Sequence, residues 1–271
     1  MQYDYIIVGA GSAGCVLAER LSANGRYTVL LMEAGGTDRR FWIKVPLGYG
    51  YTFSDARVNW CYSAQADPGL HRREAYWPRG RVLGGSSSIN AMAYMRGLAH
   101  DYDDWEAAGA TGWNWAEVRR MFVALERNDE TGPDGKRRTR GEGPVWVSES
   151  SDRMHPFTRH FLRAGRELRW PVLDDLNGDR QEGLGHVRST VRNGRRWSSA
   201  DAFLRPARRR GNLTVVSSAM VEKVLIENGR ATGVRYRAGA QQRTADAARE
   251  VIVSAGAVNS PQLLQLSGIG P

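Results

Sequence analysis

The chain has 271 residues, of which 41% are hydrophobic and 25% are charged. This balance is typical of a globular protein with one or two domains and enough apolar side chains for a sizeable core. No run approaches the ~18–20 apolar residues that a membrane-spanning helix needs, so we expect no transmembrane segment. The N-terminus has no basic region ahead of its apolar run, which excludes a signal peptide and makes the cytoplasm the expected location.

The net charge of +9 comes almost wholly from arginine. Basic clusters such as 136–140 and 208–210 are short, and no aromatic residues interleave with them. The pattern therefore favours a solvated surface, and we expect no nucleic-acid partner. The two cysteines, Cys15 and Cys61, fit a reducing compartment. Neither lies in a CxxC motif or near a base, so both are expected to serve packing.

In chain order, the first elements form a strand–turn–helix–strand unit. An apolar run rich in Ile, Val and Tyr over 3–8 predicts a buried strand, and apolar residues at helical spacing over 13–21 predict a helix. A glycine turn over 9–14 lies between them, and a second buried strand is expected over 27–32. The periodicity fades from 37 to 77, which indicates long irregular connections.

The middle of the chain is predicted to be mainly helical. Residues 84–92 change from a glycine–serine turn to the start of a helix, and further helices are expected over 101–108, 115–127 and 155–168. The segment 128–143 is polar and rich in Gly, Arg and Asp, which predicts an exposed loop.

Three apolar runs in the last third resemble the strands of an antiparallel meander: 213–216, 221–227 and 232–236. Asn228-Gly229 between two of them is a hairpin turn signal. A last buried strand over 251–254 precedes a helix that is expected to start at Pro261. The predicted fold class is therefore α/β, with a Rossmann-like parallel sheet joined to an antiparallel meander.

The turn GAGSAG contains the spacing G-x-G-x-x-G at Gly9, Gly11 and Gly14. Gly9 permits the tight turn, Gly11 lets the backbone approach a pyrophosphate, and Gly14 lets the helix lie close on the sheet. The helix N-terminus offers free N–H groups and a positive dipole end. Glu33 ends the second strand, where it can accept hydrogen bonds from a ribose diol. The motif predicts a dinucleotide site but does not by itself distinguish FAD from NAD.

Two later segments are also rich in small residues. PRGRVLGGSSSINAMAYMRG occupies 78–97, and SAGAVNSPQLLQLSGIGP occupies 254–271. In the first, Gly84-Gly85-Ser86-Ser87 forms a loop whose backbone can approach a flat ligand closely. In the second, the end of a strand leads into a helix, which suits a turn beside a cofactor.

With the opening turn, these segments resemble the glucose–methanol–choline (GMC) oxidoreductase family, and the resemblance runs from residue 3 to residue 271. Gly80-Arg81, 83–87 and Ile89-Asn90 are similar to the first signature of the family. Gly256-Ala257, Ser260-Pro261, Leu263-Leu264 and 267–270 are similar to the second. Further residues between the signatures resemble the choline and alcohol dehydrogenase branch: Asn177-Gly178, Glu182-Gly183, Gly194-Arg195, Trp197-Ser198 and Asn212-Leu213.

The resemblance implies FAD as the cofactor and assigns a set of residues to its site. The opening turn and Glu33 would hold the ADP half, and Val221 would meet the adenine through its backbone. Residues 90–93 would pack their backbone against the flavin ring. The full set is Gly9, Gly11, Ser12, Ala13, Gly14, Glu33, Ala34, Arg81, Val82, Gly85, Ser86, Asn90, Ala91, Met92, Ala93, Val221, Ala255 and Gly256. Some relatives tether the flavin covalently through a histidine at the position of Ile89, so here we expect non-covalent binding.

The implied reaction is oxidation of an alcohol carbon, in which hydride moves to flavin N5 and a base takes the hydroxyl proton. The resemblance places the catalytic histidine, with its His or Asn partner, far downstream of the second signature, beyond the end of this chain at Pro271. We therefore expect no catalytic residue within these residues and interpret the sequence as an N-terminal fragment. The resemblance implies FAD-binding segments at about 1–36, 75–97 and 205–271 and partial substrate-domain segments at about 37–74 and 98–204.

None of the local histidines lies in a recognisable catalytic motif, and none is spaced for a metal site. They are His71, His100, His155, His160 and His186. We expect surface or packing roles for them and no bound metal.

Three functions remain open at this stage. The first is an FAD-dependent alcohol oxidoreductase with a small alcohol substrate. The second is a catalytically incompetent FAD-binding fragment. The third is an NAD-dependent dehydrogenase, which the two later segments disfavour. The sequence leaves open the alcohol and the electron acceptor, which is oxygen, a quinone or another carrier.

Overall fold

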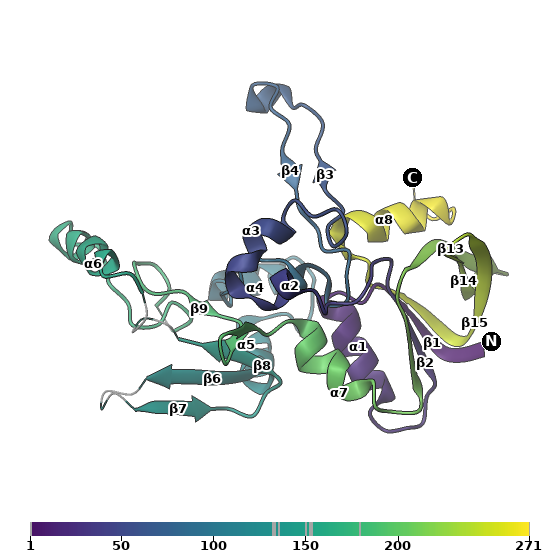
Figure 1. The fold of residues 1–271 in the computed structure, drawn as a ribbon, viewed down its shortest axis with the longest axis horizontal. Helices are drawn as coiled ribbons and strands as arrows, with labels where there is room; N and C mark the ends of the chain where they lie inside the picture. The colour runs from purple at the N-terminus through teal and green to yellow at the C-terminus, as the bar shows by residue number, and fades with distance from the viewer. Residues whose placement is uncertain are drawn as a thin grey trace. The chain divides into compact units, whose positions relative to one another are not determined.

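The computed structural model describes residues 2–131, 134, 136–149, 151, 154–178 and 180–270 (Figure 1). It contains two compact units, one formed by Met1–Ala91 with Arg195–Pro271 and the other by Met92–Gly194. Residues 37–74 thus belong to the same unit as the opening glycine turn. The assignment of 1–36, 75–97 and 205–271 to FAD binding, and of 37–74 and 98–204 to a substrate domain, stays a prediction. Within the described ranges, no helix has the length and apolar character needed to cross a bilayer.

The first unit is built on a six-stranded sheet in the order β12-β2-β1-β15-β14-β13. Its strands are β1 (Gln2–Val8), β2 (Val29–Met32), β12 (Leu213–Val216), β13 (Ala219–Glu227), β14 (Arg230–Ala238) and β15 (Gln241–Val253). β12, β2, β1 and the second half of β15 run parallel, whereas β13, β14 and the first half of β15 are antiparallel. This mixed sheet confirms the predicted α/β class.

The core of this sheet lies around its central strands. Ile6, Leu30 and Met32 form one buried cluster with Val224 and Val234 of the meander. All four residues of β2 are buried, which is why its sequence is a continuous apolar run instead of an alternating one.

Two strands predicted in the last third are present, at 213–216 and from Val251 to Val253, but the predicted pairing of the first and the predicted start of the second are wrong. The run 213–216 is not a meander strand, because β12 pairs in parallel with β2. The third meander strand is β15, which begins ten residues before the predicted strand at 251. Its first half is mostly exposed and polar, and only small Ala245 and Ala247 point inward, so the apolar signal is weak. The Asn228-Gly229 turn is confirmed, since both residues have positive φ (50° and 77°) and join β13 to β14.

The remaining elements of the first unit are short, apart from two helices. They are α1 (Ser12–Ser22), α2 (Phe41–Lys44), α3 (Tyr49–Thr52), α7 (Arg205–Ala207), α8 (Gly256–Leu266), the 3₁₀ turns η1 (Pro46–Gly48), η2 (Pro68–Leu70) and η3 (Gly85–Ser88), the π-turn η5 (Ala200–Leu204), and the strands β3 (Tyr62–Ser63), β4 (Tyr76–Trp77) and β11 (Arg195–Arg196). The prediction that the last helix starts at Pro261 is wrong, because α8 starts at Gly256 and contains this proline. Pro271 lies outside the described residues.

The second unit contains a five-stranded sheet in the order β5-β9-β8-β6-β7. Its elements are α4 (Ala99–Ala107), α5 (Trp115–Leu125), α6 (Phe157–Glu167), β5 (Ala93–Tyr94), β6 (Glu126–Thr131), β7 (Arg137–Arg140), β8 (Val145–Ser148), β9 (Arg188–Ser189) and β10 (Val191–Arg192). The three predicted helices are therefore confirmed to within a few residues.

The predicted loop over 128–143 is wrong, since β6 and β7 pair in antiparallel register within it. Residues 132, 133 and 135 of this segment lie outside the described residues. Both strands consist mainly of charged and polar residues with low strand propensity, which hid them in the sequence. Opposite charges across the pair, such as Arg140 and Glu130 with 2.9 Å between Nε and Oε1, stabilise the pairing instead.

Candidate functional site

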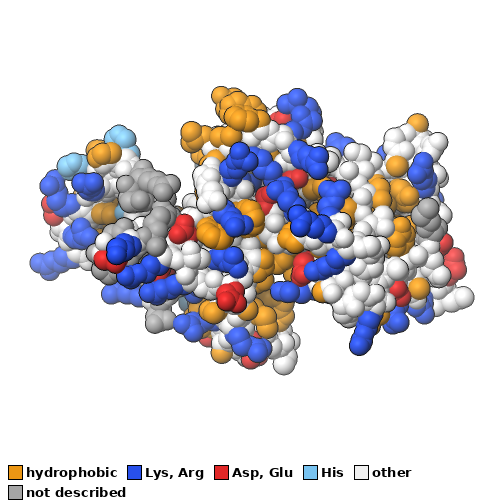
Figure 2. All heavy atoms as spheres, turned by 60° about the horizontal axis from the view of Figure 1, so that its bottom comes forward, with side chains coloured by type: hydrophobic (Ala, Val, Ile, Leu, Met, Phe, Trp, Pro, Cys, Tyr) orange, Lys and Arg blue, Asp and Glu red, His pale blue; other side chains and the backbone are white. Residues whose placement is uncertain are grey.

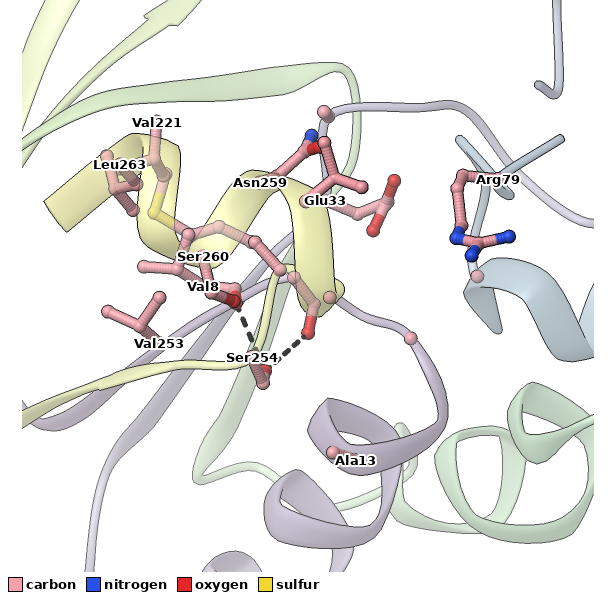
Figure 3. Close-up of a pocket in the computed structure, with 18 of the residues that line it drawn as sticks. Val8, Ala13, Glu33, Arg79, Val221, Val253, Ser254, Asn259, Ser260 and Leu263 are labelled. Carbon is pink, nitrogen blue, oxygen red and sulfur yellow. Dashed lines mark hydrogen bonds between the residues drawn. The ribbon is translucent and has the colours of Figure 1, made fainter. Parts of the chain in front are cut away.

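The first unit contains a cavity of about 610 Å³ at the carboxyl ends of β1 and β15 (Figure 3). Its wall includes the turn after β1, the end of β2, the loop before η3 and the start of α8. Crevices at the carboxyl ends of parallel strands are the usual ligand sites of open α/β sheets. The volume also lies within the range of small-molecule and cofactor sites.

The glycines of the opening turn have different surroundings. Gly9 has a φ of 98°, and a Cβ there would lie 2.6 Å from the Ser254 carbonyl oxygen. A Cβ on Gly14 would lie 1.9 Å from the Gly9 carbonyl oxygen, so no side chain fits there. A Cβ on Gly11 would meet no protein atom within 4 Å. The fold itself therefore needs Gly9 and Gly14, whereas Gly11 leaves open space at the cavity wall.

Two helices begin at this cavity. Ser12 and Ala13 of the first turn of α1, and Gly256 and Ala257 of the first turn of α8, line it. The first N–H groups of a helix have no intrahelical acceptor, and the helix dipole makes this end positive. Neither first turn contains an acidic residue that would compete for these donors. The cavity is therefore suited to bind an anionic group such as a diphosphate.

Glu33 is the buried acid of the cavity, with 6% of its surface exposed. Its carboxylate accepts hydrogen bonds from the backbone N–H groups of Ala10 at 3.0 Å and Gly35 at 2.9 Å. Burial raises the pKa of Glu33 to about 7, although these two donors and the charge of Arg81 act in the opposite direction. The side chain can therefore change its ionisation state near neutral pH.

The glycine–serine loop packs directly on the opening turn. The Gly84 N–H donates to the Ala10 carbonyl at 2.7 Å. A Cβ on Gly85 would lie 2.7 Å from Gly11 Cα, so the two backbones approach as closely as glycine allows. Within the loop, the Gly80 N–H donates to Ser86 Oγ at 3.1 Å. Two motifs that lie more than 70 residues apart in sequence thus form one wall.

The structure brings together eleven of the predicted site residues around this cavity: Gly9, Gly11, Ser12, Ala13, Glu33, Ala34, Gly85, Ser86, Val221, Ala255 and Gly256. Gly14 lies directly beneath the turn. Arg81 places its guanidinium 5.0 Å from the ring centre of Trp60, a residue of the wall.

The other predicted residues do not line the cavity. Val82 is fully buried in a cluster with Ile43, Val58 and Ile89. Asn90 and Ala91 are exposed at the end of the loop. Met92 and Ala93 begin the second unit, where Ala93 pairs with Ser189.

Several wall residues were not predicted from the sequence. Arg79 lines the cavity, as do Glu33 and Asn259 (Figure 3). Trp60 and Asn259 also line it, and Asn259 accepts a hydrogen bond from Tyr62 Oη at 2.7 Å. The arginine at 79 stands beside the recognised Gly80-Arg81 pair and could have been included. Asn259 lies within the recognised segment 254–271, whereas nothing in the local sequence marks Trp60.

Among the described residues, the histidines and Cys15 do not line the cavity. Cys15 is fully buried, its Sγ contacts the Ala10 carbonyl at 3.3 Å, and burial raises its pKa to about 12. A thiol with so high a pKa is unreactive, which agrees with a packing role.

Comparison with known proteins identifies relatives over the whole chain. The family model described as GMC oxidoreductase matches residues 3–271. Oxygen-dependent choline dehydrogenase of Photobacterium profundum is 48% identical over 271 residues, which are 99% of this chain and 47% of that protein. Mitochondrial choline dehydrogenase of Homo sapiens is 46% identical over 99% of this chain and 46% of its own length. The chain thus spans about half the length of these curated relatives.

Solved structures also match almost the whole of this chain and about half of their own length. A pyridoxine 4-oxidase from Mesorbium loti superposes with a TM-score of 0.91 at 35% identity, covering 99% of this chain and 52% of that one. An FAD-dependent oxidoreductase from Chaetomium thermophilum superposes with a TM-score of 0.90 at 31% identity, covering 99% of this chain and 48% of its own.

Proposed function

The chain belongs to the GMC oxidoreductase family, and we propose that it binds FAD and takes part in the oxidation of an alcohol to a carbonyl compound. The observation that carries this proposal is the cavity where Gly11 leaves room for a ligand beside two helix N-termini and the buried Glu33. This combination offers N–H donors to a diphosphate and an acceptor to a ribose diol. Bound FAD would accept a hydride from the alcohol carbon.

In this proposal, the chain's own residues bind and orient the nucleotide. The first turn of α1 donates its free N–H groups to the diphosphate, and Glu33 accepts hydrogen bonds from the ribose of the ADP half. The Val221 backbone lies at the adenine, and Gly85-Ser86 lies along the extended cofactor. Residues 90–93 provide backbone for the flavin ring. The roles of Glu33, Val221 and Gly85-Ser86 are supported by their positions in the cavity wall.

Arg79 adds a positive charge to the wall of the cavity. Its guanidinium lies 5.2 Å from the ring centre of Trp77 and donates to the Pro78 carbonyl at 2.9 Å. These contacts hold the side chain in place while its remaining N–H groups stay available, and guanidinium groups bind phosphates well.

We propose that the cofactor is held without a covalent bond. Ile89, at the position where a histidine would tether the flavin, has no nucleophilic atom and is 2% exposed in an apolar cluster. Removal of the cofactor by mild denaturation, followed by precipitation of the protein, is expected to leave all of the flavin in the supernatant.

The substrate class is a small alcohol, and choline is the first one to test because the relatives above carry that name. The purified chain is titrated with FAD, and the bound flavin is followed by its visible absorbance. Alcohols are then added without oxygen. Bleaching of the bound flavin supports alcohol oxidation by this chain, whereas binding without bleaching supports an FAD-binding role alone. A preparation that binds NAD and not FAD would contradict the proposal.

A further inference from the structure

Arg196 on β11 is the largest fully buried side chain of the described residues, with 1% of its surface exposed. Its Nε donates to the Ile43 carbonyl at 2.9 Å. Its Nη1 donates to the Ser87 carbonyl at 3.2 Å and to Asn90 Oδ1 at 2.8 Å. Ser87 and Asn90 belong to the glycine–serine loop, more than 100 residues away in sequence. One buried guanidinium therefore connects α2 to the C-terminal part of η3 and to Asn90, which follows it.

The residues after Arg196 support the same loop. The Ser199 N–H donates to Ser87 Oγ at 3.0 Å, and Ser87 Oγ in turn donates to the Gly84 carbonyl at 2.6 Å. A Cβ on Gly84 would lie 3.2 Å from Ala200 Cβ, so η5 packs closely on the turn. The conformation of the loop is thus determined by a distant segment as well as by its own sequence.

This position is costly for a cation. The three hydrogen-bond acceptors of Arg196 are uncharged oxygen atoms, and its Nη2 is buried with no hydrogen-bond partner among the described residues. Burial lowers the pKa of Arg196 to about 10, against the effect of Asp201, whose charge raises it. Asp201 itself already pairs with Lys44 and Arg205. A buried charge without its own counter-ion does not favour folding by itself, so a role at the neighbouring loop accounts better for it.

We propose that Arg196 is a positioning residue, which holds Ser87 and Asn90 so that the Gly84–Asn90 loop has its flavin-binding conformation before the cofactor arrives. The inference rests on the proposed FAD site and adds a residue that does not line it. A loop held in advance loses less conformational freedom when a ligand binds, which increases affinity. The loss of Arg196 would therefore loosen the loop first and weaken FAD binding as a consequence.

The test compares Arg196→Met with Arg195→Met in the full 271-residue chain. Methionine keeps an apolar stem but removes every donor, and Arg195 is the exposed neighbour that receives the same substitution. Hydrogen exchange is measured without FAD at the amides of Ile89 and Asn90, both of which donate to the Ser86 carbonyl. We expect exchange there to become about tenfold faster in Arg196→Met, with β1 and β2 unchanged, and FAD affinity to fall by about tenfold or more. Arg195→Met is expected to match the wild type.

If Arg196→Met does not fold, Arg196→Lys decides the question, because lysine keeps the charge but cannot bridge Ser87 and Asn90 as the guanidinium does. We expect Arg196→Lys to fold, with faster loop exchange and weaker FAD binding than the wild type. Wild-type exchange and affinity in the folded variant would overturn the inference. If the wild type binds no FAD while loop exchange responds to Arg196, the proposed function fails and the positioning role stands.

Discussion

A side chain at position 11 is expected to affect binding of the proposed ligand but not folding. Its φ of −76° is accessible to any residue, and an added Cβ would meet no protein atom within 4 Å. We expect Gly11→Ala to change the free energy of unfolding without FAD by less than about 1 kcal/mol. It should weaken FAD binding by at least about tenfold, since the methyl group occupies space proposed for the diphosphate. Urea unfolding and a fluorescence titration with FAD measure the two effects.

Gly14→Ala is the matched control for this experiment. Its Cβ would lie 1.9 Å from a backbone oxygen, so the fold itself should lose about 3 kcal/mol or more. Equal FAD binding by Gly11→Ala and the wild type would show that the open space is not part of a nucleotide site.

The ionisation of Glu33 is expected to make FAD affinity depend on pH. Its pKa is raised to about 7, and the ionised form is the better acceptor for two ribose hydroxyls. Affinity should therefore fall by about tenfold from pH 8 to pH 6, as the carboxylate becomes protonated. Glu33→Gln should bind FAD weakly at both pH values, without this dependence.

The same group has the opposite effect on the stability of the chain without ligand. Because its pKa in the folded state lies above the unfolded value, the contribution of Glu33 to stability is fully present below about pH 4.5 and is lost as the pH rises through about 7. A wild-type titration in which FAD affinity increases towards acid pH would exclude Glu33 as the ribose acceptor.

At the scale of elements, the second unit contains a buried ion pair between Glu126 of β6 and Arg96, which follows β5. Glu126 at the start of β6 is 2% exposed and accepts from Arg96 Nε at 2.7 Å and from Tyr94 Oη at 2.6 Å. Burial alone would raise the pKa of Glu126, but the hydrogen bonds from Arg96, Tyr94 and Asn128 outweigh it and lower this pKa. The pair therefore stabilises the unit above about pH 4.5, and this contribution is lost as the pH falls.

We expect Glu126→Ala to reduce the free energy of unfolding by about 3–5 kcal/mol, because it leaves the Arg96 charge buried without the carboxylate that pairs with it. Glu117→Ala breaks the exposed pair with Arg120 on α5 and should cost less than about 1 kcal/mol. Urea unfolding followed by tryptophan fluorescence compares the two. Equal effects would mean that the buried pair does not stabilise the unit.

The elements that the sequence predicted well are those with a strong local signal. β1, α1 and β2 were predicted from apolar periodicity and glycine spacing. The turn at Asn228-Gly229 was predicted because Asn and Gly tolerate the positive φ values that both residues have in the structure. β6, β7 and the first half of β15 were missed, because their mostly charged and polar residues have low strand propensity and are stabilised by pairing with a neighbouring strand. Trp60 was missed at the site because tertiary packing brings it to the cavity, whereas Asn259 lies on α8 close to the predicted Gly256.

At the scale of the whole molecule, the net charge is +9. On the face drawn in Figure 2, Lys and Arg side chains lie among acidic and apolar ones. The positive groups with a specific proposed role are few and belong to the first unit: Arg79 in the wall of the cavity and Arg196 behind the glycine–serine loop.

The most direct test is thermal unfolding of the purified chain with and without FAD. A ligand that binds only the folded state and is present at 100 times its Kd adds about 2.7 kcal/mol of stability. We predict that FAD raises the Tm by several degrees, that NAD at the same concentration does not, and that Gly11→Ala reduces the shift to about half or less. An unchanged Tm at saturating FAD, in a chain that unfolds cooperatively, would contradict the central claim that this cavity binds the cofactor.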